Sequence, residues 1–247
     1  MLAEKVVNDT FEITIPVLNE EKELEKKISI LIGFLEDKLS DRYKYSIVIA
    51  DNGSHDRTRE VSEKLIEIYP QLSYLHLTEK GVGRALKASW NRSKAKIVGS
   101  MDLDLSTQLK HLSEAFSAME KKNVDILYGT RLHKDSIIEN RSIKREITSR
   151  VFNFILQKYL GISISDAMCG FLFLRRKILK DLINRGAQNN EWFFQAELLI
   201  ISDWYGIDIF ELPVHWIDDS SSKVRILNLT IEYLKAMKRL KKNKPIK

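Results

Sequence analysis

The sequence has few of the features that mark secreted or membrane-spanning proteins. Its 247 residues include a single cysteine, Cys169, which excludes an intrachain disulfide framework. The longest apolar runs, residues 30–35 and 198–201, are far shorter than the ~18–20 residues that a membrane span needs. The opening segment MLAEKVVNDT lacks the basic residues and apolar stretch of a secretion signal. We therefore expect a cytoplasmic protein.

Two further absences narrow the function. The five histidines are scattered without the spacing of metal ligands, so we expect no zinc site. The net charge is +6, but residues 235–247 alone hold seven Lys or Arg and no acid, which leaves −1 on the rest of the chain. A basic surface over the whole molecule is therefore missing. This argues against nucleic-acid binding and indicates a local contact between the tail and something anionic.

Short β-branched runs alternate with longer helical patterns, which predicts βαβ units and a mostly parallel sheet flanked by helices. The strand patterns cover residues 11–17, 45–51, 72–77, 96–102 and 124–129, with helical patterns near 20–39, 56–69, 83–93 and 108–121. The polar segment 130–144 reads as a loop that can order on ligand binding. The later patterns are a helix at 145–160, a strand at 170–175, a helix at 191–204, a strand at 207–214 and a helix from about 225.

The strand pattern at 96–102 runs into two aspartates, Asp102 and Asp104. If the strand's period of two continues through them, both carboxylates project from one face and lie close together. Such a pair needs a divalent cation, an arginine or a shared proton beside it. An isolated D-x-D could instead be a helix cap and a solvent-facing aspartate. Because this pair ends a buried strand beside other polar loops, we favour a metal, and oxygen ligands indicate Mg²⁺ or Mn²⁺.

Three other loops follow strand ends, where ligands bind in open α/β sheets. They are PVLNEE (16–21), ADNGSHDRT (50–58) and EKGVGRAL (79–86). The second is either a turn with a helix cap or a contact for a nucleobase or ribose. The third is a weak dinucleotide fingerprint, because it lacks the third glycine; its glycines either let a ligand approach the backbone or make a turn.

Taken together, the four loops resemble the GT-A glycosyltransferases of family 2, particularly the synthases of dolichyl-phosphate mannose and glucose. IPVLNEE is similar to the family's IPxYNEE, ADNGSHDRT to DDGSxDxT, MDLDLS to DADLS, and YGTR to GSR or GTR. Three later segments also fit the family pattern: DAMCGFLFLRR (166–176), FFQAELL (193–199) and ELPVHWIDDSSSKV (211–224). Seven motifs in one order cover nearly the whole chain.

The resemblance implies a GT-A fold, here a single catalytic domain over residues 1–225. Its nucleotide-sugar-binding half would be 1–129 and its acceptor half 130–225, followed by an amphipathic helix and basic tail at 226–247. Asp102 and Asp104 would hold Mg²⁺ or Mn²⁺ against the donor diphosphate, with Ser106 or Gln108 near the metal. The other residues implied at the nucleotide sugar are Pro16, Leu18, Glu20, Asp51, Asn52, Gly81 and Leu103.

The resemblance also implies an inverting transfer of mannose or glucose, from GDP-mannose or UDP-glucose, to dolichyl or polyprenyl phosphate. A phosphate dianion needs cations rather than a general base. One alternative is an acceptor that is a saccharide hydroxyl or another non-lipid group, for which Glu197 is the candidate base with Asp166 behind it. A second alternative is a nucleotidyltransferase. That class would show a glycine-rich, basic signature near the first strand, where PVLNEE is acidic. The candidate cations, which could also be a solvated basic surface, are Arg131, Arg145, Lys223 and Arg225.

Three residues depart from the family pattern. Leu18, Asn52 and Leu103 stand where the family has tyrosine, aspartate and alanine. The first two bear on the nucleotide pocket, so the donor base is left open. The last helix either rests on anionic lipid or packs on the domain and leaves only its basic tail free. Many relatives carry transmembrane segments after the catalytic domain. Because this sequence shows none, we expect a soluble enzyme, a peripheral one on the cytoplasmic membrane face, or one with a membrane-anchoring partner protein.

Overall fold

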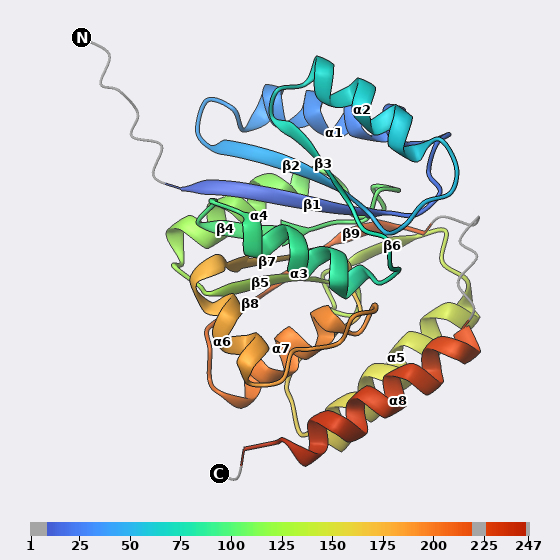
Figure 1. The fold of residues 1–247 in the computed structure, drawn as a ribbon. Helices are drawn as coiled ribbons and strands as arrows, with labels where there is room; N and C mark the ends of the chain where they lie inside the picture. The colour runs from blue at the N-terminus through green and yellow to red at the C-terminus, as the bar shows by residue number, and fades with distance from the viewer. Residues whose placement is uncertain (1–8, 219–225, 246–247) are drawn as a thin grey trace.

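A seven-stranded sheet forms the centre of the computed structural model, which describes residues 9–218 and 226–245, with residues 226–230 as backbone only (Figure 1). Its strand order is β3-β2-β1-β4-β7-β5-β8, and only β7 runs antiparallel to its neighbours. The mostly parallel sheet predicted from the sequence is therefore confirmed. The strands are β1 (Thr10–Val17), β2 (Lys44–Asp51), β3 (Leu72–His76), β4 (Ile97–Ser100), β5 (Ile126–Thr130), β7 (Leu172–Arg175) and β8 (Ile209–Pro213).

Helices cover both faces of the sheet. One apolar cluster joins the sheet to α1, α2 and α4, and a second joins it to α3, α5, α6, α7 and α8. Burial on both faces explains why the inner strands read as nearly continuous apolar runs. The helices are α1 (Leu24–Lys38), α2 (Thr58–Ile68), α3 (Val82–Arg92), α4 (Lys110–Lys121), α5 (Ile143–Leu160), α6 (Leu179–Asn184), α7 (Phe194–Trp204) and α8 (Ile226–Lys242), with a 3₁₀ helix η1 (Arg176–Ile178).

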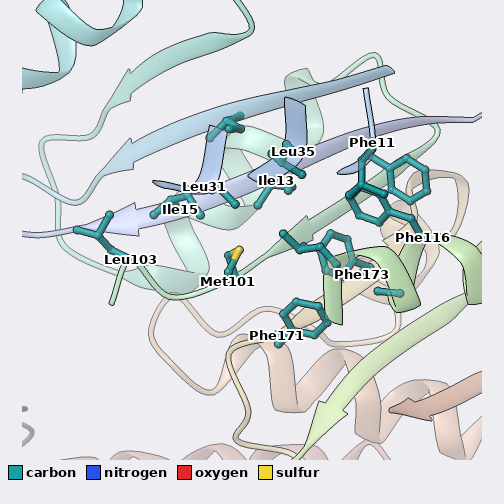
Figure 2. Close-up of a cluster of buried hydrophobic side chains, with 14 of the residues drawn as sticks. Phe11, Ile13, Ile15, Leu31, Leu35, Met101, Leu103, Phe116, Phe171 and Phe173 are labelled. Atoms are coloured by element: carbon teal, nitrogen blue, oxygen red, sulfur yellow. The ribbon is translucent and has the colours of Figure 1, made fainter. Parts of the chain in front are cut away.

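The cluster beneath α1 and α4 runs the length of β1 (Figure 2). Aromatic rings fill its amino end, where Phe11 stacks on Phe116 at 3.7 Å between centroids and Phe173 meets Phe116 edge-on at 5.4 Å. At the other end Figure 2 shows Leu103 beyond Ile15, near the carboxyl end of the strand. The core thus reaches the edge of the sheet where the predicted site lies.

Two short strands were not predicted from the sequence. Within the segment 130–144, predicted to be a loop, β6 (Ile137–Glu139) pairs in parallel with β9 (His215–Ile217). Three residues are too few to show a period of two, which explains the miss. The described end of α8 packs on the fold, because Ala236, Met237 and Leu240 are buried in the second cluster. This matches the packing alternative for that helix.

Gly99 in β4 is required by the packing of β7. A Cβ at this position would lie 2.1 Å from Cδ1 of Phe173, so Gly99→Ala is expected to lower the free energy of unfolding by on the order of 1–3 kcal/mol. Gly33 in α1 is the control, because a Cβ there meets nothing within 4 Å. Gly33→Ala is expected to raise stability by roughly 0.5–1 kcal/mol. Urea unfolding of both variants would measure this, and equal effects would contradict the packing argument.

Candidate active site

The loops after β1 and β2 form one rigid unit at the carboxyl edge of the sheet. The backbone N–H of Asn19 donates to Ser54 Oγ at 2.9 Å, and Asn19 Oδ1 accepts from the N–H of His55 at 2.8 Å. The N–H of Glu20 donates to Thr58 Oγ1 at 2.8 Å. These bonds fix the two loops that the sequence assigns to the base and ribose.

Asp51 and Asn52 lie buried at the floor of these loops. Asp51 accepts hydrogen bonds from Tyr74 Oη at 2.6 Å and from the N–H of Ser54 at 2.8 Å. Burial works to raise the pKa of Asp51, but these hydrogen bonds outweigh it and hold the pKa below its ordinary value. Asn52 Oδ1 has no hydrogen-bond partner among the described residues. A buried orphan acceptor fits a ligand N–H donor, such as one on a nucleobase.

The predicted pair Asp102 and Asp104 does not continue a strand. β4 ends at Ser100, and the pair lies on a turn in which Asp104 Oδ1 accepts from the N–H of Ser106 at 2.8 Å. The period-of-two argument was therefore wrong, although the two carboxylates do lie near one another. Burial and then the negative charge of Asp104 raise the pKa of Asp102 to about 7, against a weaker lowering by Arg131.

The turn is anchored by contacts that the sequence did not indicate. Lys27 of α1 donates to the carbonyl oxygen of Asp104 at 2.7 Å. Leu103 is only 7% exposed and belongs to the core cluster, which corrects the expectation that its side chain meets the nucleotide sugar. The carboxylate of Asp102 lies against Gly170, where a Cβ would come within 2.4 Å of Oδ2. The glycine of the DAMCGF motif thus leaves room for this carboxylate.

Arg131 is held beside this pair by a buried salt bridge. Its Nε lies 2.8 Å from Asp166 Oδ2 and its Nη2 lies 3.0 Å from Oδ1, with a further bond from Nη2 to the carbonyl of Met168. Its guanidinium also stacks 4.9 Å from the ring centroid of Trp216. Burial opposes the charge, but Asp166 raises the pKa of Arg131 above its ordinary value. Asp166 therefore fixes Arg131, which fits the structural alternative for this aspartate.

A second arginine near Arg131 was missed in the sequence. The side chain of Arg141 is 6% exposed, and its Nη1 has no hydrogen-bond partner among the described residues. Burial and then the positive charge of Arg131 lower the pKa of Arg141. Arg145 lies on the same segment, with Nη1 3.3 Å from Asp218 Oδ2. Arg141 sits in an aperiodic polar stretch, so no sequence signal predicts its burial.

Two of the predicted acceptor residues, Lys223 and Arg225, lie outside the described residues, and their roles stay predictions. Gly81 packs closely on the loop before α7: its φ is +143°, and a Cβ would lie 2.3 Å from the carbonyl oxygen of Asn190. Its place at the nucleotide sugar stays a prediction. Pro16 is half-buried and Leu18 is 37% exposed, so both are accessible at the edge of the loops.

Glu197 does not face the carboxylate pair. Its Oε2 accepts from the N–H groups of Gln188 and Asn189, both at 2.7 Å, and its Oε1 pairs with Arg239 of α8. With its carboxylate fully buried and both oxygens occupied, Glu197 fits the structural alternative better than the general-base one. Gln195, two residues earlier and about 200° around the helix, is the α7 residue that bonds Ser100, where β4 ends.

The donor set suits a magnesium-type ion. Within the described ranges no group of three or more His, Cys, Asp or Glu side chains could hold a metal. Two carboxylates, Asp102 and Asp104, match Mg²⁺ or Mn²⁺, which take the rest of their ligands from phosphates and water. Ser106 lies beside them, with its backbone N–H bonded to Asp104 Oδ1. Burial, and after it repulsion from Asp104, raises the pKa of Asp102, and a cation would relieve that repulsion.

Residues 12–183 match the model of the family named Glycosyl transferase family 2. The chain belongs to this family. This chain is 27% identical over 244 residues to dolichyl-phosphate beta-glucosyltransferase of Dictyostelium discoideum. The alignment covers 95% of this chain and 74% of that relative. The chain is 25% identical over 217 residues to glycosyltransferase AglD of Haloferax volcanii, covering 87% of this chain but spanning about a third, 34%, of that relative.

A solved structure has the same fold as this protein. Glucosyl-3-phosphoglycerate synthase from Mycobacterium tuberculosis, crystallised with Mn²⁺, UDP and glucosyl-3-phosphoglycerate, superposes with a TM-score of 0.68. The superposition covers 98% of this chain and 83% of that one at 16% identity. The expected GT-A architecture is confirmed at the level of the fold.

Asp102→Asn should change how stability depends on pH in chelator-treated protein. Because burial and Asp104 raise the pKa of Asp102 to about 7, the folded state holds a proton that the unfolded state releases near 4. Stability from this group is present at low pH and is lost as pH rises towards 7. The asparagine variant cannot ionise and should be more stable at pH 8 by on the order of 1–4 kcal/mol.

Urea unfolding at pH 5, 6, 7 and 8 measures the difference, which should grow with pH and level off above 7. Asp37→Asn on the exposed end of α1 is the control. A variant no more stable than the parent at pH 8 would contradict the burial of an ionisable carboxylate.

Proposed function

We propose that this family 2 glycosyltransferase transfers a hexose from a nucleoside diphosphate sugar to a polyprenyl or dolichyl phosphate. The observation that carries the proposal is the juxtaposition of two sites of opposite charge. The carboxylate pair Asp102 and Asp104 suits a cation-bound diphosphate, and the arginines 131, 141 and 145 suit an anionic acceptor. The relatives named dolichyl-phosphate beta-glucosyltransferases favour glucose as the hexose.

The donor would bind across the loops after β1, β2 and β4. Ionised Asp51 and the orphan oxygen of Asn52 would accept hydrogen bonds from the base or ribose. Asp102 and Asp104, with Ser106, would hold Mg²⁺ or Mn²⁺. A divalent ion there supplies Lewis-acid neutralisation of the departing nucleoside diphosphate. Since Leu103 fills the core, the turn that carries both aspartates is held rigid.

The acceptor needs positioning more than deprotonation. A phosphomonoester is largely a dianion at neutral pH and is already nucleophilic, so no general base is required. This agrees with Glu197, whose carboxylate is occupied by backbone N–H groups and Arg239. Arg131 is pre-oriented by Asp166 and costs little entropy on binding a phosphate.

The direct test is transfer by the purified chain with Mn²⁺, a panel of UDP and GDP sugars and a short-chain polyprenyl phosphate. We expect glucosyl transfer that stops on chelation and returns with Mn²⁺ or Mg²⁺. Asp104→Asn should lower kcat by at least about a hundredfold, because the donor diphosphate loses a charged ligand for its cation. Unfolding curves like those of the parent would show that the fold is kept.

The control for Asp104→Asn is Asp135→Asn, an exposed aspartate of the segment between β5 and β6. Full activity of Asp104→Asn would contradict the metal assignment. Transfer to a free saccharide but to no lipid phosphate, with any donor, would contradict the acceptor.

Arg141→Gln should raise the KM for the phosphate acceptor roughly tenfold to a hundredfold and leave the KM for the donor unchanged, because one charge-assisted hydrogen bond to phosphate is lost. Arg59→Gln, on the exposed face of α2 and paired with Glu63, is the control. Initial-rate kinetics with each substrate varied in turn would separate the two constants. An unchanged acceptor KM would remove Arg141 from the acceptor site.

A further inference from the structure

Helix α5 exposes an apolar stripe that the described part of the fold leaves uncovered. The residues recur at three- and four-residue steps, so they share one face of the helix. Ile143 is 80% exposed and Phe154 is 58% exposed, although both are large apolar side chains. We call this set the α5 stripe: Ile143, Ile147, Val151, Phe154, Ile155 and Tyr159.

The opposite face of α5 is apolar too. Leu156 and Leu160 are buried in the core cluster shared with α8. A helix that is apolar on both faces is normally covered on both. Isolated exposed apolar residues need no explanation, but a continuous stripe along a helix of 18 residues marks a binding surface.

Helix α8 lies alongside α5 and extends this surface. Phe152 and Tyr233 have ring centroids 5.6 Å apart, and Lys241 Nζ donates to the carbonyl of Tyr159 at 2.7 Å. Figure 1 shows the two helices together at the periphery, away from the central sheet. In α8, Ile231 is 57% exposed and Leu234 is 53% exposed.

The charge of this layer points to an anionic partner. Among the side chains of α5 and α8 that the structure describes, no Asp or Glu is exposed to the same degree as the basic residues. Cations beside an apolar stripe are the signature of a helix that lies in the interface of an anionic bilayer. The exposed basic residues are Lys144, Arg150, Lys158, Lys235, Lys238, Lys241 and Lys242.

We propose that the outer face of α5 and α8 docks on an anionic lipid bilayer, with the α5 stripe inserted among the head groups. The docking element is thus a folded helix pair, not only the basic tail predicted from the sequence. In the described part of the chain, no helix combines the length and apolar character needed to cross a bilayer. Attachment would therefore be lateral, along the helix axes.

The position of α5 supports a bilayer over a protein partner, a step that rests on the proposed function. The helix begins at Ile143, two residues after Arg141, and Arg145 in its first turn contacts Asp218. The cations proposed for the acceptor phosphate therefore lie at one end of the apolar stripe. A lipid phosphate whose chain stays in the bilayer could reach them without leaving the membrane.

The test is flotation of the purified chain with acceptor-free vesicles of phosphatidylcholine, with or without phosphatidylglycerol. We expect binding to anionic vesicles that weakens with salt. Val151→Ser with Phe154→Ser should lower the partition constant about tenfold or more, because two inserted apolar side chains are lost. Both positions are exposed, so the melting temperature should not fall.

Ile68→Ser is the matched control, since Ile68 is 64% exposed on α2, outside the α5–α8 layer, and should leave vesicle binding unchanged. The double variant should keep its kcat with a water-soluble short-chain acceptor. Unchanged flotation of the double variant would overturn the proposal. The proposal would also be overturned if the parent chain did not bind anionic vesicles and formed a dimer that the same two substitutions convert to a monomer. Because the vesicles hold no acceptor, absent transfer would count against the proposed function alone.

Discussion

The salt bridge between Arg131 and the fully buried Asp166 is the contact on which the candidate site depends. Asp166 accepts from Nε, Nη2 and the backbone N–H of Arg131, so it fixes both the side chain and the end of β5. Ser165, next to it, bonds Thr130 and Glu211. Removing either partner would leave an uncompensated buried charge, which costs about 3–5 kcal/mol. The contacts of Asp166 and Ser165 thus join the ends of β5 and β8 where the arginines proposed for the acceptor begin.

The salt bridge also sets the electrostatics of the neighbouring carboxylates. Arg131 is already neutralised by Asp166, so it offsets the charge of Asp102 only weakly, and the pKa of Asp102 stays raised to about 7. A free arginine would satisfy the carboxylate pair by itself and compete with a metal ion. Because Arg131 is already paired with Asp166, the negative charges of Asp102 and Asp104 are not balanced by it. In the proposed function, a divalent cation bound to the donor diphosphate would supply that charge.

The sequence predicts the sheet and loop order well because both rest on local patterns: strand and helix periods, and polar residues at strand ends. It fails where orientation depends on distant contacts. Spacing alone did not show that β4 stops at Ser100, nor that Leu103 turns into the core. In FFQAELL the pattern gave no means to know that Gln195 faces β4 while Glu197 faces α8. Arg141 escaped notice because its burial follows from tertiary packing.

One helix links the two chemical demands of a lipid-linked acceptor. A polyprenyl phosphate presents a dianion and an apolar chain within one molecule, so its enzyme needs cations and a membrane contact at a fixed separation. In the proposed arrangement α5 provides both, with Arg145 in its first turn and the α5 stripe along its outer face. The helix is anchored by Leu156 and Leu160 in the core, so the separation is set by rigid packing. This would explain an apolar surface that the stability of the isolated fold does not require.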